Sequence, residues 1–165
     1  MITFVNKDSR LSTCALGLVV PLLACGCASS GRTHDDVGYL NAPSGKLYYE
    51  AAGDGPPVVL IHGGQMDLRI WDEQVALLSP NHRVIRYDVR GYGRSPAPQK
   101  VYANHEDLAA VLDQLGLHRA TLVGLSLGGG IAIDFAISYP DRVEKLVAVA
   151  PGLSGFDWSP GAWDA

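Results

Sequence analysis

Two short apolar runs, ending in glycines or at a serine, most constrain the fold of this chain. Residues 56–64 read PPVVLIHGG, and residues 120–126 read ATLVGLS. Neither run alternates apolar with polar residues, and such a run is typical of a strand buried on both faces of its sheet. Strands of this kind occur in parallel sheets that helices cover on both sides. The two runs therefore predict an α/β fold.

The segments around these runs predict further strands and helices in alternation. Further strands are expected at 46–53, from 82 into a glycine-rich loop that ends at 95, at 144–151 and, as a second edge strand, at 37–42. Helix signals predict helices at 71–78, 104–116 and 127–140, with Asn104 as an N-cap. We expect a three-layer sandwich around a mostly parallel sheet of about six strands. Functional residues are then expected at the carboxyl ends of the strands.

The composition favours a folded domain and gives no reason to expect a nucleic-acid partner. Hydrophobic residues make up 47% of the 165 residues and charged residues 18%, with a net charge of −4. A negative chain has no electrostatic attraction to phosphate backbones. All three cysteines precede residue 28, so the expected domain offers no thiol for a disulfide, a zinc site or a nucleophile. We expect no metal and no organic cofactor.

Residues 1–24 have the layout of a secretory signal peptide. Lys7 and Arg10 precede an apolar run that is too short to span a bilayer comfortably. The run ends in LLAC, which resembles the processing box of bacterial lipoproteins, so Cys25 is the expected lipidation site and Cys27 the second choice. We expect a polar tether at 25–36, a domain at 37–165, and an exported protein anchored by lipid to a membrane of the cell envelope. The alternative is an ordinary cleaved signal with incidental cysteines.

Ser126 has the sequence context of a nucleophile. It lies between Gly124 and Gly128 in GLSLG, where a predicted strand gives way to a predicted helix, and this spacing is typical of a nucleophilic serine on a sharp turn. Such a serine is expected to adopt a strained left-handed backbone conformation at a cost of about 1–3 kcal/mol. Side chains at 124 and 128 are expected to collide with the turn, and glycine removes them. The following helix would direct free N–H groups toward an oxyanion at the serine.

Four motifs in this order resemble the α/β-hydrolase family, from about residue 44 to the end of the chain. They are HGG at 62–64, Trp71 at a helix start, DVRGYGRS at 88–95 and GLSLGG at 124–129. The resemblance implies a serine hydrolase that cleaves ester-type bonds in small molecules through an acyl-enzyme at Ser126. It also implies an oxyanion hole formed by the backbone N–H groups of Leu127 and Gly64.

The resemblance implies structural roles for other polar residues of these motifs. His62 is expected to hydrogen-bond the backbone rather than to abstract a proton. Asp88 and Arg90 are expected to pair with each other and to fix a loop. Tyr92 and Trp71 are expected in the core or in the wall of a pocket.

The expected catalytic base is absent from the sequence after Ser126. In this family the triad runs serine, acid, histidine along the chain, and Asp157 is the candidate acid. All five histidines, His34, His62, His82, His105 and His118, precede Ser126, and none is expected to reach it.

The chain therefore resembles the front portion of a hydrolase, truncated after about six strands and inactive alone. The alternative is a non-catalytic lipoprotein or pseudoenzyme that uses the sheet as a binding surface. An open last strand at 144–151 would also favour self-association.

Overall fold

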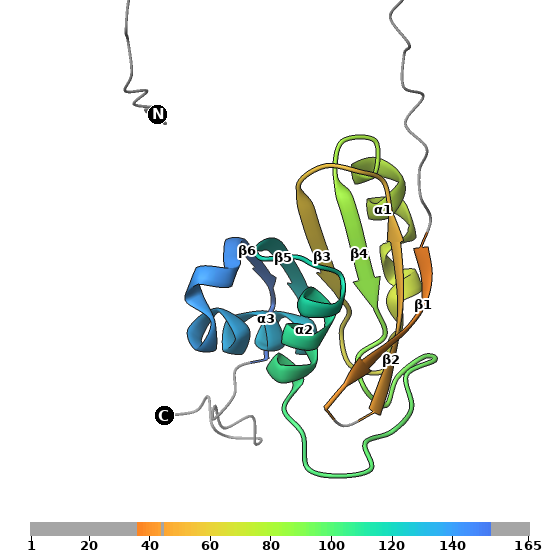
Figure 1. Ribbon diagram of the computed structural model, residues 1–165, viewed down its shortest axis with the longest axis vertical. Helices are drawn as coiled ribbons and strands as arrows, with labels where there is room; N and C mark the ends of the chain where they lie inside the picture. The colour runs from red at the N-terminus through yellow and green to blue at the C-terminus, as the bar shows by residue number, and fades with distance from the viewer. Residues whose placement is uncertain (1–35, 44, 153–165) are drawn as a thin grey trace, which may run out of the picture. The chain divides into compact units, whose positions relative to one another are not determined.

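The computed structural model describes residues 36–43 and 45–152, which contain a six-stranded mixed sheet (Figure 1). The strand order is β1-β2-β4-β3-β5-β6. β1 and β2 form an antiparallel hairpin, β2 pairs antiparallel with β4, and the pairs β3–β4, β3–β5 and β5–β6 are parallel. The strands are β1 (Asp36–Ala42), β2 (Gly45–Ala52), β3 (Pro57–Ile61), β4 (Arg83–Tyr87), β5 (Ala120–Leu125) and β6 (Val143–Val149).

Helices cover both faces of this sheet and form the outer layers of a three-layer α/β fold. Val58 and Leu60 of β3 face α1, whereas the alternate residues Val59 and Ile61 belong to the core beneath α2 and α3. All four side chains are buried, which confirms the prediction that this run is buried on both faces. The helical segments are η1 (Leu68–Trp71), α1 (Asp72–Leu78), α2 (Asn104–Gln114), α3 (Leu127–Ser138) and η2 (Pro140–Arg142). No helix within the described ranges is long and apolar enough to cross a membrane.

The start of α2 differs from the prediction by one residue. The N-cap is Ala103, and Asn104 is the first helical residue. Ala103 has an extended backbone, and its carbonyl accepts the N–H groups of Glu106 and Asp107 at 3.1 and 3.2 Å. The first turn therefore closes on a backbone carbonyl, without a hydrogen bond from a capping side chain.

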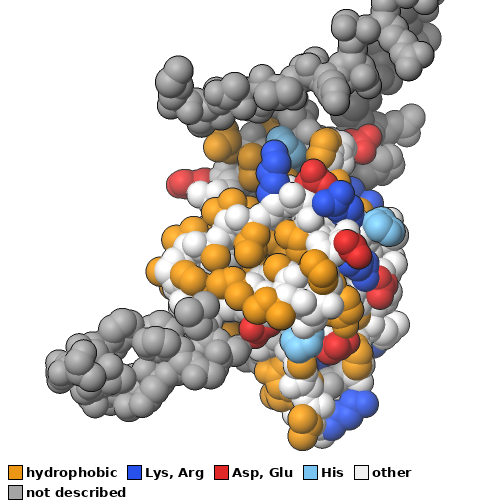
Figure 2. Space-filling view, turned by 90° about the vertical axis from the view of Figure 1, so that its left-hand side faces the viewer, with side chains coloured by type: hydrophobic (Ala, Val, Ile, Leu, Met, Phe, Trp, Pro, Cys, Tyr) orange, Lys and Arg blue, Asp and Glu red, His pale blue; other side chains and the backbone are white. Residues whose placement is uncertain are grey.

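The face and edge of β6 carry several exposed apolar side chains. Leu146, Val147 and Val149 are 39–48% exposed, and Ile137 of α3 is 75% exposed. Figure 2 shows hydrophobic side chains gathered on this side of the molecule. β6 pairs only with β5 among the described strands, so its other edge has no strand beside it in this part of the chain.

The parallel strands bring the predicted motifs to one edge of the sheet. β3, β4 and β5 run in the same direction, and their carboxyl ends lead directly into His62, Asp88 and Ser126. Segments far apart in the sequence therefore meet where functional residues of open α/β sheets gather.

Candidate active site

Ser126 forms the turn between β5 and α3. Its φ of 50° and ψ of −111° are unfavourable for a residue with a Cβ atom, and its side chain is exposed. Its N–H donates to Val149 O at 2.9 Å, and its own carbonyl accepts the N–H groups of Gly130 and Gly152 at 3.0 Å. The positive φ agrees with the expected strained turn, although ψ lies outside the left-handed helical region. The backbone bonds hold this conformation in place.

The glycines on either side of Ser126 leave no room for a side chain. A Cβ atom added to Gly124 would lie 2.2 Å from Gly128 O, inside the turn itself. A Cβ atom added to Gly128 would lie 2.2 Å from Ile61 O at the end of β3. Gly124 therefore serves the turn as predicted, whereas Gly128 is required because α3 begins against the neighbouring strand rather than against its own turn.

Gly64 and Leu127, the two residues predicted to donate to an oxyanion, are neighbours in space. Leu127 is the first residue of α3, and a Cβ atom added to Gly64 would lie 4.0 Å from Leu127 Cδ2. Within the described ranges, the N–H groups of Gly64 and Leu127 donate to no other backbone carbonyl. Free N–H groups at a helix N-terminus and in an adjacent loop can stabilise negative charge on a bound oxygen.

His62 is committed to the backbone, as expected. The ring is fully buried; its Nε2 accepts the N–H of Val89 at 2.9 Å, and its Nδ1 lies 2.7 Å from Gly63 O. An Nε2 that accepts a hydrogen bond fixes the proton on Nδ1, which donates to the carbonyl. Both ring nitrogens are therefore occupied, and His62 ties the loop after β3 to the loop after β4.

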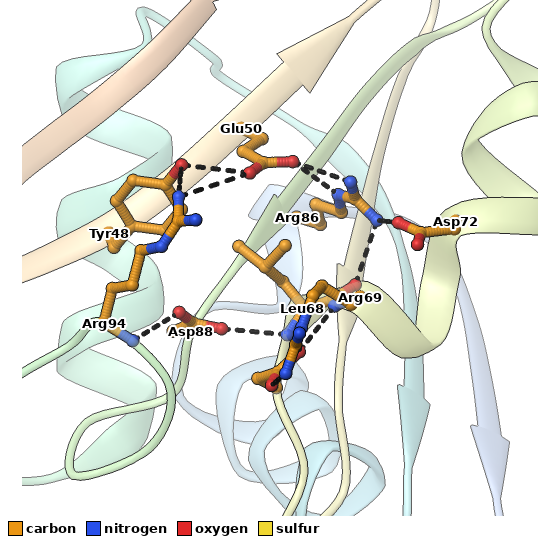
Figure 3. A network of polar contacts seen from close by, with 9 residues as sticks. Tyr48, Glu50, Leu68, Arg69, Asp72, Arg86, Asp88 and Arg94 are labelled. Atoms are coloured by element: carbon orange, nitrogen blue, oxygen red, sulfur yellow. Dashed lines mark hydrogen bonds and ion pairs between the residues drawn. The ribbon is translucent and has the colours of Figure 1, made fainter.

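Asp88 makes a second connection between the same two loops (Figure 3). Its carboxylate accepts the N–H of Leu68 at 2.8 Å and that of Arg94 at 2.7 Å. The Ser95 hydroxyl donates to the carbonyl of Asp88 at 2.6 Å. A Cβ atom on Gly93 would lie 2.2 Å from an Asp88 oxygen, so glycine is required there. The loop that carries Gly64 is thus held from both ends.

The predicted pairing of Asp88 with Arg90 is wrong. Arg90 instead forms a bidentate ion pair with Asp107 of α2, with distances of 2.7 and 2.8 Å. Both side chains are buried, at 0% and 3% exposure. The oxygens of Asp88 are already occupied by backbone N–H groups, so Arg90 pairs with the carboxylate that the first turn of α2 brings to it.

A further polar network supports the segment after the loop that carries Gly64 (Figure 3). Arg86 of β4 donates to Glu50 at 2.6 and 3.1 Å, to Leu68 O at 3.1 Å, and to Asp72 at the start of α1. A cavity of about 310 Å³ lies beside this network, and Ser126 does not line it. This cavity is therefore not the space around the hydroxyl of Ser126.

Sequence comparison assigns this fold to a family. A family model described as the alpha/beta hydrolase fold matches residues 56–163. The chain belongs to the α/β-hydrolase fold family. This match includes Gly64, Ser126 and Leu127, the three residues of the candidate site.

Individual α/β hydrolases resemble this chain over part of their length. The 2-hydroxy-6-oxo-6-phenylhexa-2,4-dienoate hydrolase of Comamonas testosteroni is 34% identical over 117 residues, which cover 66% of this chain and 41% of that protein. The crystal structure of the enol-lactonase from Burkholderia xenovorans LB400 is 35% identical, with a TM-score of 0.64, over 67% of this chain and 45% of that one. A hydrolase structure from Pseudomonas aeruginosa PA01 has the same identity and TM-score over 67% and 44%. This chain spans less than half the length of these relatives.

The other described histidines of this chain lie away from Ser126. The ring of His105 is 6.4 Å from that of Tyr139, which follows the 12 residues of α3. Those residues separate Tyr139 from Ser126 by about 18 Å. His82 and His118 precede β4 and β5, and the length of a strand of five or six residues, about 17–20 Å, separates the two edges of the sheet. Asp157, His34, Cys25 and Cys27 lie outside the described residues.

Proposed function

We propose that this chain carries the nucleophile and the oxyanion-binding half of a serine hydrolase that cleaves ester-type bonds. The observation that carries the proposal is the geometry of Ser126, which is exposed at positive φ where α3 begins. Leu127 follows Ser126 directly, and Gly64 lies next to the Leu127 side chain; within the described ranges neither N–H group donates to a backbone carbonyl. One structural relative is named as an enol-lactonase, and a lactone is a cyclic ester.

The reaction would be acyl transfer through Ser126. The hydroxyl oxygen attacks the ester carbonyl, and the carbonyl oxygen becomes an oxyanion that the N–H groups of Leu127 and Gly64 stabilise. Each such donor contributes about 2.7–4 kcal/mol to the stability of the transition state. The alcohol then leaves, and water hydrolyses the ester formed on Ser126.

Attack also requires a group that accepts the serine proton. Among the described histidines, His62 is next in sequence to Gly63, which is a neighbour of Ser126, but the two ring nitrogens of His62 are bonded to the backbone. We therefore propose that this chain alone reacts slowly. The same observation favours a second candidate, a pseudoenzyme or lipoprotein that binds ligands without turnover.

An added base distinguishes these two candidates. The chain is incubated with 4-nitrophenyl acetate, with and without imidazole, and acetylation of Ser126 is followed by mass spectrometry. If Ser126 is a nucleophile that lacks its base, acetyl-Ser126 should form faster as the imidazole concentration rises. The modification should be absent in Ser126→Ala. Ser138→Ala, at the far end of α3, is the matched control and retains the modification. No acetylation of Ser126 at any imidazole concentration would exclude the hydrolase and favour the binding protein.

Export and anchoring are a separate proposal. We propose lipidation of Cys25, with Cys27 as the second choice, because both follow the apolar run of the leader. Radioactive palmitate should label the mature protein and not Cys25→Ala. Label that persists in Cys25→Ala and is lost in Cys27→Ala would move the site to Cys27. Absence of label from the unmodified mature protein would exclude the lipid anchor.

A further inference from the structure

Met66 lies beside the candidate nucleophile. A Cβ atom added to Gly63 would lie 3.3 Å from Met66 Sδ and 3.6 Å from Ser126 Cβ. The thioether and the nucleophile therefore flank the same glycine. Met66 is also 45% exposed, so much of its side chain remains available for contact with a bound molecule.

The backbone on both sides of Met66 is fixed. Gln65 has a φ of 58°, a strained conformation for a residue with a side chain, and it separates Met66 from the oxyanion residue Gly64. On the other side, Asp67 caps η1 by accepting the N–H of Arg69 at 2.9 Å, and the N–H of Leu68 donates to buried Asp88. The loop thus holds the methionine in place while its long side chain can adapt to a partner.

Leu127 and Tyr92 lie at the adjacent glycine. A Cβ atom added to Gly64 would lie 3.7 Å from Tyr92 Oη and 4.0 Å from Leu127 Cδ2. The apolar side chains of Met66 and Leu127 therefore border Gly63 and Gly64, together with two uncharged polar atoms, Leu125 O and Tyr92 Oη. This environment favours an apolar group on the reacting carbonyl carbon.

We propose that Met66 contacts the acyl chain of the substrate and that this site takes esters with an apolar acyl chain in preference to acetyl esters. This inference rests on the proposed serine hydrolase function. In the step concerned, the bond between Ser126 Oγ and the acyl carbon forms, the bond from that carbon to the leaving oxygen breaks, and the serine proton passes to the imidazole that is added as a base. Met66 acts on selectivity, because a thioether neither gives nor takes that proton.

Competing esters test the proposal in the full chain. Ser126 is acylated in the presence of imidazole by 4-nitrophenyl acetate and by 4-nitrophenyl hexanoate, and the ratio of hexanoyl to acetyl rates is measured. Met66→Ala should reduce this ratio about tenfold, within the range that a few methylene contacts provide. Met66→Leu should restore most of the ratio. Leu77→Ala is the matched control, because Leu77 is an exposed apolar residue on α1, and it should leave the ratio unchanged.

A spectroscopic readout separates contact from an effect on folding. With methyl-¹³C methionine the chain gives two methyl signals, from Met1 and Met66. The Met66 signal should shift on hexanoylation of Ser126 and much less on acetylation, while Met1 serves as the reference. Two results would overturn this inference and leave the proposed function intact. One is an unchanged ratio of hexanoyl to acetyl rates in Met66→Ala; the other is hexanoylation of Ser126 without a shift of the Met66 methyl signal. Failure of both esters to acylate Ser126 would overturn both.

Discussion

Gly128 is the residue at which the turn, the helix and the sheet meet. Its Cα faces the carbonyl of Ile61, and a backbone atom cannot move aside as the end of a side chain can. The same helix contains Gly129 and Gly130 in its first turn, although glycine lowers helix stability by about 0.5–1 kcal/mol per residue relative to alanine. Close packing of the helix start against β3 therefore outweighs helix propensity at this position.

Gly128→Ala should lower the free energy of unfolding by about 1–3 kcal/mol or more, because overpacking typically costs this amount. Gly38→Ala is the matched control, because a Cβ atom there would lie 3.6 Å from a Tyr49 ring atom, which is an ordinary contact. Urea unfolding measures both variants. Equal stability of Gly128→Ala and the unmodified chain would contradict the close approach of α3 to β3.

Tyr49 should titrate well above an ordinary tyrosine. Burial, and then the hydrogen bond from its hydroxyl to Asp36 at 2.7 Å, raise its pKa to about 12. Because the pKa is higher in the folded state, the stability from this neutral hydroxyl is present below pH 10 and is lost as the pH rises from 10 to about 12. Asp36→Asn should lower the Tyr49 pKa but leave it above 10, as observed by NMR with ¹³C-labelled tyrosine. A Tyr49 pKa near 10 in the unmodified chain would contradict the buried hydroxyl.

At the level of elements, the Arg90–Asp107 ion pair fastens α2 to the loop after β4. Both partners are buried, so removal of one leaves an unpaired charge inside the protein. Arg90 follows Asp88 and Val89 in the same loop, and Val89 is the backbone partner of His62. The ion pair therefore connects α2 to the loop that His62 and Asp88 tie to the loop after β3.

Asp107→Ala should lower the free energy of unfolding by about 3–5 kcal/mol, as is typical when one partner of a buried ion pair is removed. The double variant Arg90→Met, Asp107→Leu should recover most of this loss, because it leaves no buried charge. Glu144→Ala, which removes the half-exposed partner of Arg119, is the control and should change stability by less than about 1 kcal/mol. A double variant no more stable than Asp107→Ala would show that the pair does more than neutralise charge.

At the level of the whole molecule, the sheet, its two helical layers and the edge where the motifs meet could be predicted from the sequence. Apolar runs and helix signals are local patterns, and strand direction then places His62, Asp88 and Ser126 at one edge. Side-chain partners were harder to predict. Arg90 pairs with Asp107 and not with Asp88, because backbone N–H groups already bond the carboxylate oxygens of Asp88. Met66 carries no sequence signal for a site, because only the folded loop shows that Met66 and Ser126 flank the same glycine.

The exposed apolar side chains of β6 predict association of this polypeptide when it is expressed by itself. Val147 and Val149 are 48% and 46% exposed on a strand of the parallel part of the sheet. Such strands are normally covered, and an open edge can pair with another chain. Val147→Lys should shift the protein toward a monomer in analytical ultracentrifugation. A monomeric unmodified chain with a sharp thermal transition would contradict this prediction.

The labelling rate of Ser126 by a fluorophosphonate most directly tests whether the site has a nucleophile without its base. We predict slow labelling of Ser126 that is abolished in Ser126→Ala, because the oxyanion donors act without a proton acceptor. Binding and oxyanion stabilisation alone give about 10³–10⁴-fold acceleration over water in enzymes that lack their triad. Rapid, stoichiometric labelling abolished by Ser126→Ala would contradict the account, and substitution of His62, His105 and His118 in turn would then identify the base.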